Sequence, residues 1–173
     1  TGLHINVSLP ELDLDKLDYV KLVLLLGDQY VLQQFGRLGN TYAASAFTNI
    51  QKRLQGNDMD SVSDMVPTLL DHMRQQMITA AARVIHAPQT DKYTSVNVKN
   101  KYVEFRSAGG NYLENQQAIK ITLLRYVRAL AIAADPQAEK QEYATKLYKL
   151  LKGTSNTPNA SVDLFSQFSS GLL

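Results

Sequence analysis

The amino-terminal residues alternate between apolar and polar side chains. Apolar residues at positions 3, 5 and 7 are separated by polar residues at positions 4, 6 and 8, and Pro10 follows. A period of two is typical of a strand with one buried face, and proline cannot continue a hydrogen-bonded ladder. The pattern predicts a strand over residues 2–8 in which His4 and Asn6 point away from the core.

The apolar spacing then changes to about 3.6 residues, which is the period of an amphipathic helix. Apolar positions between Leu17 and Leu32 predict one helix, with Asp13 or Asp15 as its cap and its end near Gly36. The same reasoning predicts further helices over residues 42–54, 67–86, about 119–135 and 137–152. Pro67 suits the first turn of the second of these helices, and Pro136 ends the third.

Two short alternating segments, residues 92–99 and 101–107, predict a hairpin that turns at Asn100. In the second segment Val103 and Phe105 would face the core, so Glu104 and Arg106 would face the opposite side. Tyr93, Ser95 and Asn97 of the first segment are expected on that polar side. The predicted fold class is α+β, in which a small antiparallel sheet, formed by the first strand and the hairpin, packs against about five helices.

Composition limits the class of protein. The chain has 173 residues, a net charge of +2 without a basic stripe, and no apolar run long enough to cross a bilayer, so neither nucleic acid nor a membrane is an expected partner. The absence of cysteine excludes disulfides, thiolate zinc sites and a cysteine nucleophile, and it fits a cytoplasmic location. We expect a domain over residues 1–152, and a flexible linker and tail over 153–173.

The predicted polar face suggests a chemistry. A carboxylate such as Glu104 is a hard oxygen ligand for magnesium or manganese, an imidazole such as His4 can be another ligand, and the fork of Arg106 suits phosphate. A simpler interpretation is that Glu104 and Arg106 form a solvated ion pair and that His4 is an incidental surface residue. Residue spacing leaves both interpretations open.

At these residues the sequence resembles glutamine synthetases. Residues 2–9, Gly-Leu-His-Ile-Asn-Val-Ser-Leu, are similar to their His-x-His-x-Ser-Leu strand. Residues 103–107, Val-Glu-Phe-Arg-Ser, followed by Asn-Tyr-Leu at 111–113, are similar to their Glu-Phe-Arg-Ser-Pro-Asp and Asn-Pro-Tyr-Leu segments. Glutamate-cysteine ligases and putative amidoligases share this order of elements, and the amidoligases are closest in length. The resemblance covers residues 2–135, is specific in the two strands, and implies the carboxy-terminal part of such a catalytic domain.

The resemblance implies roles for individual residues. Glu104 stands at the position of a metal-binding carboxylate, and Arg106 at that of the arginine that holds the transferred phosphoryl group, so both are expected to be catalytic. His4 stands at the position of a histidine that contacts the metal or a nucleotide phosphate. Asn6 replaces the second histidine of the pattern and can hydrogen-bond to the cofactor, although an amide is a poor metal ligand.

Two further basic residues are candidates for cofactor binding. Lys92 lies where glutamine synthetases have an arginine that contacts ATP, in a looser alignment. Arg37 lies in a glycine-flanked loop and could bind phosphate or carboxylate.

The implied reaction is ATP-dependent amide formation through an acyl phosphate, with ATP and Mg²⁺ or Mn²⁺ as cofactors. The implied partners are a small-molecule or peptide carboxylate, an amine, and an upstream segment or second chain that supplies the remaining metal ligands, with a homo-oligomer as a further possibility. The chain begins at Thr1 without an initiator methionine, so we expect a fragment or a processed product.

Two other functions are compatible with the sequence. One departure from the resemblance is that Ala108 and Gly109 replace the Pro-Asp of the family segment. The chain could therefore be a non-catalytic structural or assembly module that retains the ligase-like fold. It could also be a helical protein-binding domain in which the hairpin has no functional role. In that case His4, Glu104 and Arg106 would lie far apart.

Overall fold

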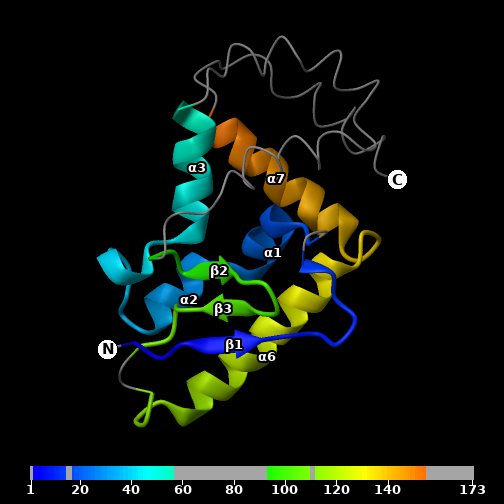
Figure 1. Ribbon diagram of the computed structural model, residues 1–173. Coiled ribbons are helices and arrows are strands. Elements are labelled where there is room, and N and C mark those ends of the chain that lie inside the picture. Colours follow the sequence, from blue (N-terminus) through cyan, green and yellow to red (C-terminus); the bar gives the residue numbers. More distant parts are fainter. Residues whose placement is uncertain (1, 15–16, 57–92, 110–111, 155–173) are drawn as a thin grey trace, which may run out of the picture.

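The computed structural model describes residues 2–14, 17–56, 93–109 and 112–154. Within these residues the fold is α+β, as the sequence predicts: a three-stranded antiparallel sheet packs against five α-helices (Figure 1). The elements in chain order are β1 (Ile5–Val7), α1 (Tyr19–Leu26), α2 (Asp28–Gln34), the 3-10 helix η2 (Thr41–Ala43), α3 (Ala46–Gly56), β2 (Val96–Val98), β3 (Val103–Phe105), α6 (Gln116–Ala134) and α7 (Lys140–Thr154).

The sheet has the order β1-β3-β2, so β3 pairs with both other strands. Phe105 lies opposite Ile5 and Val96, and Val103 lies opposite Val7 and Val98. The two apolar rows are two residues apart along each strand, and side chains two residues apart point to the same face of a sheet. Val96, Val103 and Phe105 are fully buried, which identifies this face as the one that packs on the helices.

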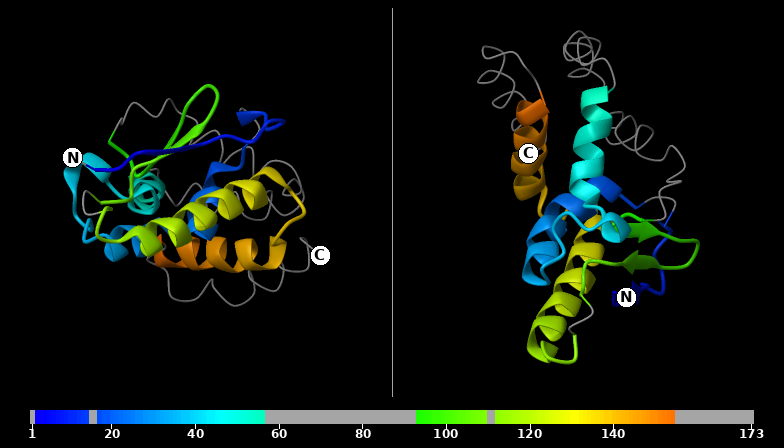
Figure 2. Two further views of the ribbon diagram at one scale, coloured as in Figure 1. Left: turned by 90° about the horizontal axis from the view of Figure 1, so that it is seen from below. Right: turned by 90° about the vertical axis from the view of Figure 1, so that its left-hand side faces the viewer.

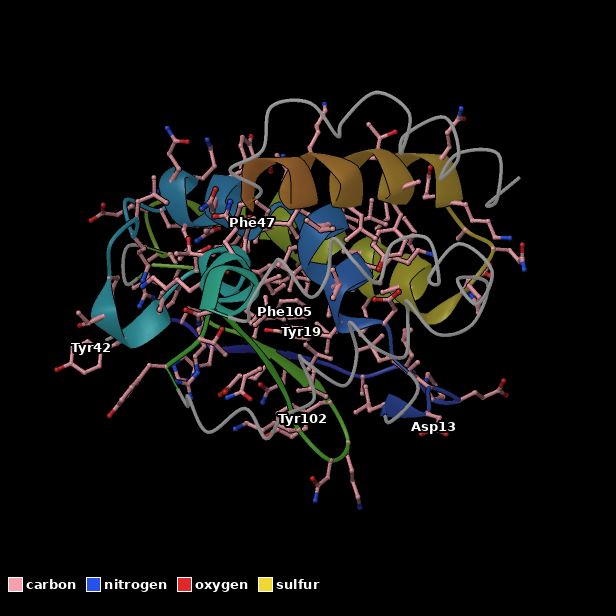
Figure 3. All side chains as sticks on the ribbon, turned by 90° about the horizontal axis from the view of Figure 1, so that it is seen from above. Asp13, Tyr19, Tyr42, Phe47, Tyr102 and Phe105 are labelled. Atoms are coloured by element: carbon pink, nitrogen blue, oxygen red, sulfur yellow. The ribbon has the colours of Figure 1, made fainter. Side chains whose placement is uncertain are left out.

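Aromatic side chains join the sheet to the helices. The Phe105 ring stacks on the Tyr126 ring of α6 with the centroids 4.1 Å apart and the planes 7° from parallel. The Tyr19 hydroxyl of α1 donates a hydrogen bond to the Val96 carbonyl oxygen at 2.8 Å. Figure 3 shows Phe105 and Tyr19 between the strands and the helices, with Tyr102 on the far side of the hairpin. The sheet therefore forms one layer, and α1 and α6 form the next, with α7 beyond them (Figure 2).

The predicted helix from Leu17 to Gly36 is wrong in one respect, because it is two helices. Gly27 adopts a left-handed conformation with a φ of 65° and ends α1, and α2 begins at the next residue. Glycine takes this conformation without the steric cost that a β-carbon brings. The prediction of Asp13 or Asp15 as the cap is wrong, because the cap of α1 is Asp18, whose carboxylate accepts a hydrogen bond from the Lys21 amide at 2.9 Å.

The other predicted elements agree in order with those of the structure. The first strand and the hairpin are confirmed, although each strand is shorter than expected. The helix expected from residue 42 begins at Ala46, after η2, and the helices expected near 119–135 and 137–152 are α6 and α7. The predicted helix over 67–86 and the tail beyond 154 lie outside the described residues. Among the described residues, none of the helices combines the length and the apolar character that a membrane span requires.

Burial raises the pKa of Tyr126 from its usual 10.0 to about 12, and the negative charge of Asp28 acts in the same direction. Since the unfolded chain ionises this hydroxyl near pH 10, its contribution to stability is complete below pH 10 and is lost as the pH rises toward 12. Over that range the free energy of unfolding should fall by about 3 kcal/mol because of this residue.

We therefore predict that Tyr126→Phe reduces the loss of stability between pH 10 and 12. Denaturant unfolding of both proteins at a series of pH values measures the effect as the difference between their stabilities. Burial also raises the pKa of Tyr143, but Tyr143 is present in both proteins, so its contribution cancels in this difference. Parallel pH profiles for the two proteins would contradict the assignment to Tyr126.

Candidate functional site

The polar row of the sheet centres on Glu104, the middle residue of β3. One carboxylate oxygen, Oε1, lies 3.1 Å from Nδ1 of His4, and the other, Oε2, accepts a hydrogen bond from Nε of Arg106 at 2.9 Å. The Glu104 side chain is 11% exposed and that of Arg106 is 16% exposed, whereas the His4 side chain is 47% exposed. This group of three, the Glu104 cluster, is a shielded ion pair with a solvent-accessible imidazole at its edge.

The strand register explains why these residues meet. Asn6 and Asn97 lie directly opposite Glu104 on the two neighbouring strands. Because β1 and β3 are antiparallel and Ile5 pairs with Phe105, the residue before Ile5 comes next to the residue after Phe105, which brings His4 to Arg106. Four predicted site residues, His4, Asn6, Glu104 and Arg106, therefore come together on one face.

This geometry bears on the simpler interpretations of the sequence. The helical protein-binding alternative required His4, Glu104 and Arg106 to lie far apart, and that expectation is wrong. The Glu104–Arg106 ion pair does form, as the other alternative required, but it is mostly shielded from solvent, and His4 contacts it directly.

Ser95 was expected on the polar face and is not part of it. Its hydroxyl donates to Oδ2 of Asp28 at 2.7 Å and accepts from the Ala46 amide at 2.9 Å. Ser95 lies in a bend before β2, so strict alternation does not reach it. The fully buried Asp28 of α2 was not predicted as a polar anchor, because nothing in the local sequence distinguishes a buried aspartate from one that starts a helix at the surface.

Arg37 contacts the two chain segments that carry the residues of the Glu104 cluster. Its guanidinium donates to the Ala108 carbonyl oxygen at 2.5 Å and packs so closely on Gly2 that a β-carbon there would overlap it. Partial burial lowers the pKa of Arg37. Since Gly2 is two residues before His4 and Ala108 is two after Arg106, these contacts hold both segments in place. Lys92, the other basic candidate, lies outside the described residues.

The cluster fits part of a divalent metal site. The described residues contain no group of three or more His, Cys, Asp or Glu side chains that could hold a metal. Magnesium in proteins commonly takes one or two carboxylates and completes its shell with phosphate oxygens and water. Glu104 and His4 can supply one carboxylate and one imidazole, so any metal here needs further ligands from a nucleotide or another segment.

Comparison of the chain with protein-family models, with curated proteins and with solved structures finds no match. Arguments about function therefore depend on the geometry and chemistry of the site.

We predict that Glu104→Gln lowers the free energy of unfolding by about 2 kcal/mol, because it removes the negative charge that accepts a hydrogen bond from the shielded guanidinium of Arg106. Denaturant unfolding at neutral pH measures the loss. The matched control is Glu142→Gln, which removes an exposed carboxylate paired with Lys146 at 2.9 Å and should cost under about 0.5 kcal/mol. Equal, small losses in both variants would show that the Glu104 pair behaves as a surface pair.

Proposed function

We propose that this chain carries the phosphate- and metal-binding face of an ATP-dependent carboxylate–amine ligase of the amidoligase type. The observation that supports the proposal is the pairing of Glu104 with His4 on one oxygen and Arg106 on the other, across two strands. A carboxylate, an imidazole and a guanidinium are together the groups that a metal–phosphate complex requires.

In this function Arg106 binds and orients the phosphoryl group that passes from the nucleotide to the acid. Glu104 holds the guanidinium through Nε, so the planar fork is fixed before the ligand arrives. A cation that is already in position stabilises the negative charge that develops on the phosphoryl oxygens, and it does not have to move during the reaction. This electrostatic stabilisation is usually the largest contribution to the catalysis of phosphoryl transfer. The shielding of both side chains strengthens this electrostatic effect.

The other residues of the face assist binding. His4 is the most exposed of the three and presents its imidazole at the rim, where a metal or a phosphate oxygen can reach it. Asn6 is exposed next to Glu104 and can hydrogen-bond to a ligand there. When bound, Mg²⁺ or Mn²⁺ and ATP supply the activated phosphoryl group, and the acid and the amine are the remaining substrates.

One observation favours a second function, a structural or assembly module that retains this arrangement without catalysis. Both oxygens of Glu104 already have partners within the chain. Metal binding would have to compete with Arg106 and His4 for this carboxylate. In the structural module the same contacts act only to fix β1 against β3.

Calorimetric titration separates the two functions. We predict that Mg²⁺-tripolyphosphate binds to this chain, or to the longest natural chain that contains it, and that Arg106→Gln weakens binding at least about tenfold, because a charged hydrogen bond to phosphate is lost. Arg128→Gln is the matched control, since the Arg128 side chain on α6 is 76% exposed and pairs with Glu139, which lies between α6 and α7. Equal affinity of the Arg106 variant and the wild-type protein, or no binding by either chain, would reject the ligase and leave the structural module.

A further inference from the structure

Tyr42 and Tyr93 form an exposed pair of aromatic rings. Tyr42 of η2 is 68% exposed and Tyr93 is 39% exposed, and their ring centroids are 5.6 Å apart with the planes at 82°. Edge-to-face contact is a favourable geometry for aromatic rings. Figure 3 shows Tyr42 at the outer end of the molecule, beside η2 and away from the helical core. The pair therefore presents aromatic surface to solvent.

Backbone hydrogen bonds place this pair at the same end of the sheet as the Glu104 cluster. The Arg106 amide donates to the Ser95 carbonyl oxygen at 2.8 Å, so Ser95 is the neighbour of Arg106 across the hairpin. The amide of Ser95 donates to the carbonyl oxygen of Ala44 at 2.7 Å. The amide of Ala44 in turn donates to the carbonyl oxygen of Tyr93 at 2.8 Å. This end is on the left in Figure 1, where β3 ends and β1 and β2 begin.

The chain limits how far the pair can lie from the end of the sheet that carries Arg106. Tyr93 is two residues before Ser95, the neighbour of Arg106, and two residues span at most about 7 Å. Tyr42 is likewise two residues before Ala44. A ligand that engages Arg106 with one end can therefore reach the tyrosines with the other.

Tyr42 is held in position by its own loop. The side chain of Asn40 accepts a hydrogen bond from the Tyr42 amide at 2.8 Å, and the Asn40 amide donates to the Arg37 carbonyl oxygen at 3.1 Å. Arg37 in turn donates to Ala108, two residues after Arg106. The loop that carries the tyrosine is thus tied directly to the strand end that carries the arginine, which reduces the entropy lost when a ligand contacts both.

We propose that Tyr42 and Tyr93 form the platform on which the base of a nucleotide stacks, while its phosphates bind the Glu104 cluster. This inference rests on the proposed function and adds the subsite that distinguishes a nucleotide from a simple polyphosphate. Aromatic side chains bind any base through its π-face, and loss of one stacking ring typically weakens binding by between about fivefold and a hundredfold. The Tyr42 ring is 68% exposed although it contacts the Tyr93 ring, so most of its surface is open to a planar ligand.

The experiment is calorimetric titration of the same protein with Mg²⁺-ATP and with Mg²⁺-tripolyphosphate. Tyr42→Ala is expected to weaken ATP binding about tenfold or more and to leave tripolyphosphate binding within twofold of wild type. Tyr42→Phe keeps the ring and should keep the affinity for ATP. Tyr30→Ala is the matched control, because Tyr30 is 52% exposed but lies on α2 beneath Arg125.

The two ligands separate failure of the platform from failure of the proposed function. Wild-type protein that binds tripolyphosphate as tightly as ATP, with both lost in Arg106→Gln, would overturn the platform alone. Equal weakening of both ligands in Tyr42→Ala would also overturn it, since it would show that the ring only supports the fold. No binding of either ligand would overturn the proposed function and the platform together.

Discussion

The antiparallel register of β3 with its two neighbours is the constraint on which the rest of the structure depends. Because side chains alternate between the two faces of the sheet, the two apolar rows face α1 and α6. The row of Asn6, Glu104 and Asn97 lies on the opposite face. A shift of one residue would move Phe105 away from Tyr126 and would turn Glu104 toward the core. Core packing therefore fixes the site, because the same backbone pairing determines both.

The shielded Glu104 carboxylate adds a second requirement. A charge removed from water is tolerated when it is paired and hydrogen-bonded, and Glu104 meets this condition through His4 and Arg106. Arg37 extends the arrangement, since it clamps the backbone at Gly2 and Ala108 on either side of the paired strands. The result is a charged group whose geometry is set before any ligand binds, which suits a phosphate-binding role.

Local patterns predicted the parts of this structure that depend on neighbouring residues. Alternation in three short segments predicted the strands, their apolar faces and the meeting of His4, Asn6, Glu104 and Arg106. Helical periodicity did not reveal the break at Gly27, because apolar spacing continues across it, and alternation failed at Ser95 because the chain bends there. The contacts of Arg37 and the buried partner of Ser95 join distant segments, and no local pattern records such contacts.

Nuclear magnetic resonance of the arginine side chains offers the most direct measurement of whether this face binds nucleotide phosphate. The Nε–H resonance of Arg106 should already be shifted by its bond to Glu104, and titration with a Mg²⁺ complex of a non-hydrolysable ATP analogue should shift it further, while those of Arg125 and Arg128 stay in place. A saturable shift confined to Arg106 and its neighbours is the result expected of a preformed phosphate site. An Arg106 resonance that does not move while the analogue binds elsewhere, or does not bind, would contradict it.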